Sequence, residues 1–117
     1  MTKKIQRGEI WLVNLEPTKG QEINKTRPCV VITSDQYRIL LLRVVVPITE
    51  WDDRYKKIPW FVRIKRSRIN NLDKESAADC LQIRSVSEDR FIRKIGDVTP
   101  DEMADIIAAI QFLISTP

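Results

Sequence analysis

The stretch NKTRPCVVIT, residues 24–33, sets an arginine directly before a proline at the start of an apolar, β-branched run. The run CVVIT, residues 29–33, favours a β-strand. Pro28 biases Arg27 toward extended dihedral angles, so the guanidinium of Arg27 is held in place. A fixed guanidinium can donate two parallel hydrogen bonds to a phosphate. An exposed cation before any strand would have the same sequence, so the stretch alone leaves both interpretations open.

The residues before this stretch predict a central strand followed by a long loop. EIWLVNL, residues 9–15, places Ile10 and Leu12 on one side and Trp11, Val13 and Leu15 on the other, which is typical of a strand buried on both faces. Residues 16–28 form a polar connection of 13 residues. Connections of this length are usually functional or disordered.

The residues after the stretch predict further strands. Ser34 is a candidate N-cap for one short helical turn. Strand candidates are residues 40–49, 61–65 and 76–84, with a second long loop after Thr49. Pro47 implies a bulge, an edge position or the end of its strand, because proline has no N–H for a ladder hydrogen bond.

The C-terminal segment predicts an α-helix. Thr99 is the cap, Pro100 takes the first helical position, and Glu102 completes a capping box. Apolar residues follow at helical spacing, at Met103, Ile106, Ile107, Ile110, Leu113 and Ile114. We therefore expect an α+β fold in a single domain over residues 1–117: a small β-barrel of five or six strands, this C-terminal helix and one or two short helices.

The charge distribution indicates a nucleic-acid partner. The net charge is +4, and residues 54–68 hold seven Lys or Arg and no acid, together with Tyr55, Trp60 and Phe61. Cations interleaved with aromatic rings suit a single-stranded nucleic acid, in which phosphates pair with the cations and bases stack on the rings. A solvated strand face with its loop would have the same composition.

The residue inventory excludes several kinds of site. The chain has no histidine and two isolated cysteines, so we expect no metal site, no cofactor and no Ser-His-Asp or Cys-His hydrolase. Cys29 and Cys80 lie in strand-like runs and are expected to be buried. No apolar stretch approaches the ~20 residues that cross a bilayer, which predicts a cytoplasmic protein with no membrane partner.

Four blocks of sequence together resemble the MazF/PemK/Kid family of toxin endoribonucleases. They are RGEIWLVNLEPTKGQE (residues 7–22), TRPCVVIT (26–33), VVVPIT (44–49) and LQIRSV (81–86), in the family's order and spacing. The resemblance extends over roughly residues 7–114.

This resemblance implies an SH3-like barrel that acts as a homodimer and cleaves single-stranded RNA at a short sequence, without metal. It also implies a cognate antitoxin peptide as a partner. The family's catalytic pair corresponds here to Arg27 and Thr49. We expect Arg27 to stabilise the dianionic phosphorane and to pass a proton to the leaving oxygen, while Thr49 donates a hydrogen bond to the phosphate.

The general base stays open at this point. Some relatives have a histidine where this chain has Gln21, and an arginine and an aspartate where it has Asp79 and Leu81, so an acid–base scheme built on those side chains does not operate here. Glu22, matching a loop glutamate common in the family, is one candidate base. A solvent hydroxyl oriented by Arg27 is another, and Glu22 could instead pair with Lys25 or Arg27.

Sequence preference is expected to come from the two long loops and one strand end. The candidate RNA-binding residues are Gln21, Glu22, Trp51, Tyr55, Lys57 and Gln82. For Trp51, a lid over the core is an equally good interpretation.

Two other functions share part of this pattern. A gyrase-poisoning toxin of the same fold binds a protein and needs no Arg27–Thr49 pair, but its binding residues lie in a C-terminal segment unlike QFLISTP, residues 111–117. A non-catalytic nucleic-acid-binding barrel would need the basic stretch alone.

Overall fold

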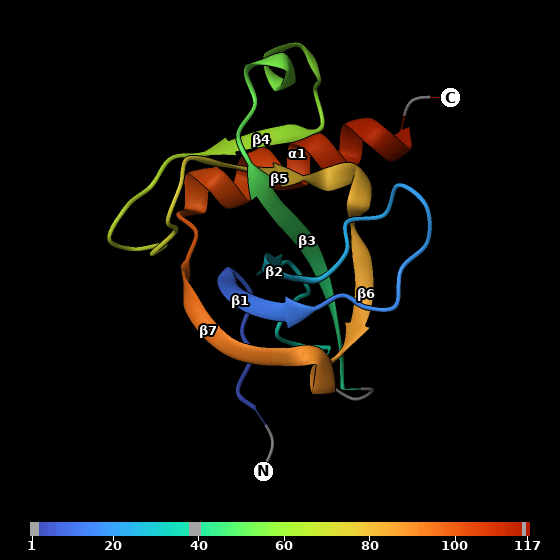
Figure 1. Ribbon diagram of the computed structural model, residues 1–117, viewed down its shortest axis with the longest axis vertical. Helices are drawn as coiled ribbons and strands as arrows, with labels where there is room; N and C mark the ends of the chain where they lie inside the picture. Colours follow the sequence, from blue (N-terminus) through green and yellow to red (C-terminus); the bar gives the residue numbers. More distant parts are fainter. Residues whose placement is uncertain (1–2, 38–40, 116) are drawn as a thin grey trace.

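The computed structural model describes residues 3–37, 41–115 and 117. Seven strands and one long helix make up the regular structure (Figure 1). The strands are β1 (Glu9–Asn14), β2 (Thr26–Val31), β3 (Leu42–Glu50), β4 (Phe61–Ile64), β5 (Ser76–Asp79), β6 (Arg84–Ser87) and β7 (Phe91–Asp97). The helix is α1 (Pro100–Ser115), and three 3-10 helices are η1 (Asp53–Lys57), η2 (Cys80–Gln82) and η3 (Glu88–Arg90). No helix in the described ranges is long and apolar enough to cross a membrane.

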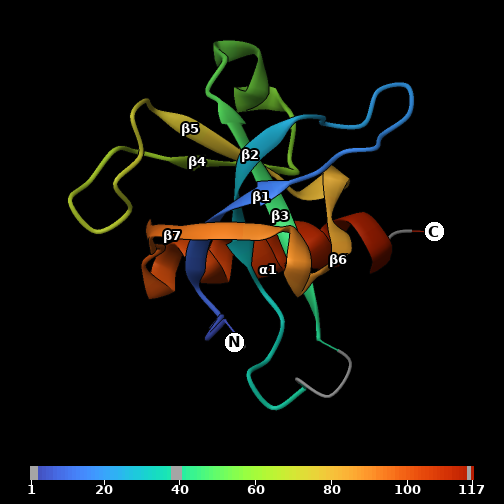
Figure 2. The same ribbon diagram turned by 60° about the horizontal axis from the view of Figure 1, so that its bottom comes forward.

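The sheet is antiparallel and centres on β2 and β3. Its order is β4-β5-β3-β2-β1-β7, and β6 pairs with the first half of β3. Along one edge of β3, the pairing partner changes. The first half of β3, up to Val45, pairs with β6, and the second half, from Ile48 onward, pairs with β5. Pro47 lies at this change of partner, where that edge has no ladder to interrupt. The strands curve around the interior rather than lying flat (Figure 2).

The two faces of the central strands are both buried, because each covers its own cluster of apolar side chains. One cluster includes Ile10, Val30 and Val46 and packs against α1. The other includes Trp11, Val13, Leu15, Cys29, Val31, Val45 and Phe91. The alternation predicted for residues 9–15 is confirmed for Ile10 on one face and for Trp11, Val13 and Leu15 on the other, whereas Leu12 is half-buried and belongs to neither cluster. β1 lies between β2 and β7 as an internal strand.

The predicted α+β fold is confirmed, with several differences in detail. The sheet is not a closed barrel, because no pairing joins the edge strands β4 and β7 among the described residues. The single strand expected over residues 76–84 is two strands separated by η2. Ser34 caps a turn and not a helix, its Oγ accepting from Gln36 N at 3.3 Å. The remainder of that segment, and the start of the strand expected from residue 40, lie outside the described residues.

The capping box of α1 is confirmed. Glu102 N donates to Thr99 Oγ1 at 3.1 Å, and Thr99 N donates to Glu102 Oε1 at 2.9 Å. Met103, Ile106 and Ala109 are buried by the helix, whereas Ile114 is 79% exposed because the last turn extends past the sheet. Ile114 is thus wrong as a member of the core-facing stripe.

A buried carboxylate, Glu9, lies at the start of β1. Glu9 accepts hydrogen bonds from Trp11 Nε1 at 3.0 Å and Gln6 N at 2.8 Å, and forms an ion pair with Lys94 at 3.1 Å. Burial alone would raise the pKa of Glu9, but these three partners outweigh it and lower the pKa below its ordinary 4.5.

We expect this carboxylate to stabilise the folded state above about pH 4.5, and its contribution to disappear as the pH falls through the lowered pKa. Thermal unfolding midpoints measured between pH 7 and pH 3 test this. Glu9→Gln should flatten that profile, whereas Glu50→Gln, at an exposed position, should leave it unchanged. An equally steep profile in Glu9→Gln would contradict the assignment.

Candidate functional site

Arg27 lies on β2 and Thr49 on β3, two strands that are neighbours in the sheet, and each is two residues beyond the last pair of the β2–β3 ladder. The β2–β3 ladder pairs Val31 with Val45 and Cys29 with Pro47. The ladder ends at that second pair, and a continuation of its register by two residues would set Arg27 opposite Thr49, within the bounds of both strands. Because side chains alternate between faces, both project to the side of Cys29 and Pro47.

The guanidinium of Arg27 is oriented but not neutralised. Arg27 is half-buried, pairs with Val13 of β1, and donates from Nε to the carbonyl of Asn24 at 3.3 Å. In the described ranges no carboxylate forms an ion pair with it. The single neutral contact leaves the remaining N–H groups of the fork able to meet a phosphate.

Thr49 is the second-last residue of β3, which ends at Glu50. Its partner on β5 is Ala77, whose side chain is a single methyl group. Thr49 is half-buried and Trp51 is two residues further along.

The loop between β1 and β2 is closed at its base by the backbone. Leu15 N donates to Lys25 O at 2.9 Å, and Lys25 N donates to the Glu16 carboxylate at 2.7 Å. Glu22 is exposed and accepts from Lys19 N at 2.5 Å. The ion pairs of the described chain do not include one from Glu22 to Lys25 or Arg27.

Side chains from η2, β6 and η3 hold this loop through its main chain. Gln82 accepts from Ile23 N at 3.1 Å and donates to Gln21 O at 2.9 Å. Arg84 donates to the carbonyl of Leu15 at 3.2 Å. Arg90 donates to the carbonyls of Asn14, at 3.2 Å, and of Glu16. The loop lies beside β6 in Figure 1.

The aromatic side chains of the second loop contact one another. The ring centroids of Trp51 and Tyr55 are 5.8 Å apart in an edge-to-face arrangement, and Tyr55 stacks on Phe61 at 3.7 Å. The guanidinium of Arg63 covers the Trp51 ring at 4.7 Å from its centroid. One face of Trp51 and one face of Tyr55 are therefore occupied within the protein.

Comparison with known proteins identifies the family. Residues 6–114 match the model of the PemK-like, MazF-like toxins of type II toxin–antitoxin systems. The chain belongs to this family of toxins.

Named relatives and solved structures agree with this assignment. The toxin is 33% identical to endoribonuclease MazF9 of Mycobacterium tuberculosis, over 92% of this chain and 93% of the relative. It is 30% identical to endoribonuclease MazF of Staphylococcus saprophyticus, over 92% and 88% of the two chains. Its fold matches crystalline MazF from Deinococcus radiodurans with a TM-score of 0.80 and 18% identity, covering 96% of this chain and 97% of that one. A mycobacterial endoribonuclease solved in complex with its cognate antitoxin matches with a TM-score of 0.75 and 20% identity, covering 97% and 98%.

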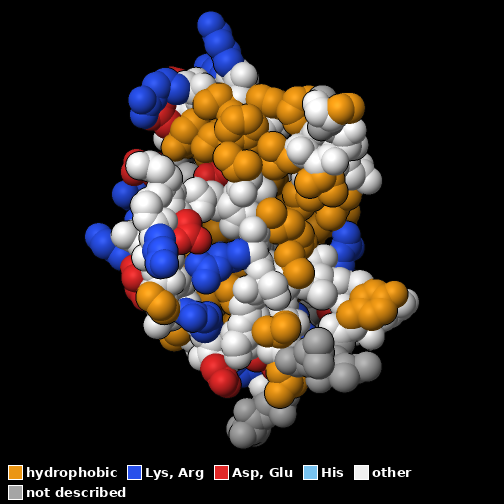
Figure 3. Space-filling model, turned by 90° about the vertical axis from the view of Figure 1, so that its right-hand side faces the viewer, with side chains coloured by type: hydrophobic (Ala, Val, Ile, Leu, Met, Phe, Trp, Pro, Cys, Tyr) orange, Lys and Arg blue, Asp and Glu red, His pale blue; other side chains and the backbone are white. Residues whose placement is uncertain are grey.

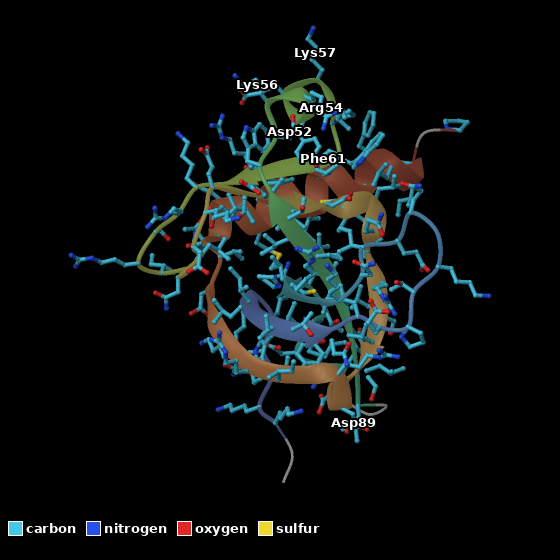
Figure 4. The ribbon with its side chains drawn as sticks, in the orientation of Figure 1. Asp52, Arg54, Lys56, Lys57, Phe61 and Asp89 are labelled. Carbon is cyan, nitrogen blue, oxygen red and sulfur yellow. The ribbon has the colours of Figure 1, made fainter. Side chains whose placement is uncertain are left out.

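The basic segment of this MazF-like toxin is divided among several elements. Arg54 pairs with Asp52 at 2.8 Å, Lys56 lies 4.0 Å from Asp53, and Arg63 pairs with Glu75. Lys56 and Lys57 project outward from η1 (Figure 4).

Two buried groups of the toxin lie close to the Arg27–Thr49 face. Asp79 follows Ala77 by two residues on β5, and burial raises the pKa of its carboxyl, although the N–H groups of Leu81 and Gln82 oppose that shift. Cys29 is buried between β1 and β3, and burial raises the pKa of its thiol to about 12. Burial likewise raises the pKa of Cys80 to about 12, so the prediction that both cysteines are buried is confirmed.

Sequence reasoning missed the roles of Arg84 and Arg90 in the toxin. For Arg84, the motif Gln-x-Arg at residues 82–84 was the available signal, although Gln82 ends η2 and Arg84 begins β6. The partners of Arg84 and Arg90 are main-chain carbonyls 69 and 74–76 residues away in the chain, and no residue pattern predicts those contacts.

Proposed function

We propose that this single-domain MazF-like toxin is an endoribonuclease that cuts single-stranded RNA at a short sequence, without a metal ion. The 2′-hydroxyl attacks the adjacent phosphate in line, and the products carry a 2′,3′-cyclic phosphate and a 5′-hydroxyl. The endoribonuclease names of its relatives, at 33% and 30% identity, support the activity. The arrangement of Arg27 and Thr49 supports the mechanism.

The observation that supports the mechanism is the pairing of β2 with β3, because a continuation of its register by two residues would set Arg27 opposite Thr49. A cationic fork with no carboxylate partner can stabilise the charge of the phosphorane as it forms. In our proposal, Arg27 also gives a proton to the departing 5′ oxygen, and Thr49 donates a hydrogen bond to a phosphate oxygen. This chemistry uses a guanidinium and a hydroxyl, which are both present in the described site.

The flanking loops supply the proposed contacts to the RNA chain. Gln21 and Glu22 are exposed on the first loop, and Lys57 projects from the second. Trp51 and Tyr55 are half-buried aromatic side chains of the second loop, and they are the proposed stacking partners of unpaired bases.

We further propose that the toxin is a cytoplasmic homodimer neutralised by a cognate antitoxin peptide. Hydrophobic side chains gather on one face of the molecule, over the end of α1 and the η2–β6 segment (Figure 3). They include Leu81, Ile83, Phe112 and Ile114, which are 56%, 36%, 49% and 79% exposed. An apolar face of this kind marks an interaction site, and a second copy of the chain is the occupant that we propose. Analytical ultracentrifugation tests the proposed homodimer, and a sedimenting mass equal to that of one chain would contradict it.

A cleavage assay with EDTA tests the proposed activity. The purified toxin is incubated with a long single-stranded RNA and excess EDTA, and the new RNA ends are mapped. We expect discrete cuts with 5′-hydroxyl ends. RNA binding without cuts would instead favour a non-catalytic module, and arrest of gyrase without cuts would favour a gyrase poison.

A further inference from the structure

The side chain of Gln82 brackets Glu22 from both sides. Its amide oxygen accepts from the N–H of Ile23 at 3.1 Å, and its amide nitrogen donates to the carbonyl of Gln21 at 2.9 Å. These two main-chain groups belong to the residues immediately before and after Glu22. The pairing also fixes the orientation of the amide, because the flipped side chain would place two donors together and two acceptors together.

The rest of the loop is held in the same way, through its main chain. Arg84 and Arg90 donate to carbonyls at the start of the loop, and Lys19 N donates to the Glu22 carboxylate itself at 2.5 Å. An exposed loop ordinarily keeps much of its backbone freedom, and fixing each residue costs about 1–2 kcal/mol of conformational entropy. These contacts offset that cost at the position of Glu22.

We propose that Gln82 is a positioning residue that holds Glu22 as the general base of RNA cleavage. This inference rests on the proposed function. The Glu22 carboxylate takes the proton of the 2′-hydroxyl, the 2′ oxygen forms its bond to phosphorus, and the bond from phosphorus to the 5′ oxygen breaks. Arg27 gives the leaving 5′ oxygen a proton, and exchange with water restores both side chains.

This role differs from the direct reading of a base by Gln82. A glutamine that reads a base needs its amide oxygen and nitrogen for the edge of that base. In this structure both atoms are engaged by the loop backbone, and Gln82 is half-buried. Because the contacts are made to main-chain atoms, they hold the loop whatever side chains it carries.

A double-mutant cycle separates the two roles. We expect Gln82→Ala to lower kcat by about tenfold with little change in KM or in the cut sites, because a displaced base loses its alignment. In the Glu22→Ala background, Gln82→Ala should cause no further loss, since the group that it positions is gone. Gln111→Ala, which removes an exposed glutamine of α1, serves as the matched control and should match the unmodified toxin.

Equal losses in both backgrounds would overturn the proposal, and so would a raised KM or altered cut sites at unchanged kcat. Limited trypsin digestion tests the loop contact without any RNA. Gln82→Ala should be cut after Lys19 several-fold faster than the unmodified toxin and the Gln111→Ala variant. An unchanged rate of nicking would overturn the proposal even if RNA is cut. Absence of RNA cleavage by the unmodified toxin would instead refute the proposed function, on which the assignment of Glu22 depends.

Discussion

Replacing Arg27 with alanine is expected to lower RNA cleavage by at least about 10²–10³-fold, below detection in a standard assay, while the toxin stays folded. The side chain donates to the main chain once, to Asn24 O at 3.3 Å, and forms no ion pair with a described carboxylate. Its loss therefore removes little from the folded state. In the proposed transition state, the phosphate gains a second negative charge, and the fork supplies the hydrogen bonds that meet it.

The comparison of two further variants makes this test specific. Arg27→Lys keeps the charge and loses the planar fork, and we expect a large loss of activity from it as well. Arg93→Ala removes a cation that is exposed on β7, and it should keep nearly full activity. Circular dichroism and thermal midpoints establish that each variant is folded. Near-normal cleavage by a folded Arg27→Ala variant would refute the catalytic assignment.

Local patterns were sufficient to predict most of the fold. The alternation of Trp11, Val13 and Leu15 predicts a strand buried on both faces, and these side chains do lie in one buried cluster, opposite Ile10. Thr99 and Glu102 predict the start of α1 because a capping box depends on four consecutive residues alone. Signals of this kind are local in the chain, so they survive without knowledge of the tertiary structure.

Strand β7 could not be predicted from the same patterns. Its pairing with β1 shifts register between Ile10 and Trp11 and again between Leu12 and Val13. Each irregularity interrupts the alternation of buried and exposed side chains along β7. Ile92 is therefore exposed, although an apolar residue in a regular strand would be expected on the buried face. The break at η2 within residues 76–84 has the same effect on the segment that contains Gln82.

In the candidate site, too, some features are predictable from the sequence and others depend on the tertiary structure. The catalytic roles of Arg27 and Thr49 are predicted from the family resemblance, and the pairing of β2 with β3 puts these two residues, 22 positions apart, on neighbouring strands. Gln82 was predicted to bind RNA, whereas its amide contacts the loop around Glu22. Those contacts join residues 59 and 61 positions apart, and they depend on how the loop folds back on η2.

The buried ion pair between Arg43 and Glu88 is expected to make a large contribution to the stability of the folded toxin. Arg43 Nη2 lies 2.6 Å from Glu88 Oε2, and the two side chains are 5% and 8% exposed. The contact is ionic rather than a well-aligned hydrogen bond. It joins the start of β3 to η3, the element that contains Arg90.

Glu88→Ala should lower the free energy of unfolding by about 3–5 kcal/mol, because it leaves the Arg43 charge buried without a partner. Urea unfolding measures this loss. Glu50→Ala is the matched control, since Glu50 and Lys74 pair at 3.6 Å with side chains 67% and 65% exposed, and its cost should stay below about 1 kcal/mol. The double variant Arg43→Met with Glu88→Leu should recover most of the lost stability, because no unpaired charge remains. If the double variant is as unstable as Glu88→Ala, the loss comes from packing and not from the buried charge.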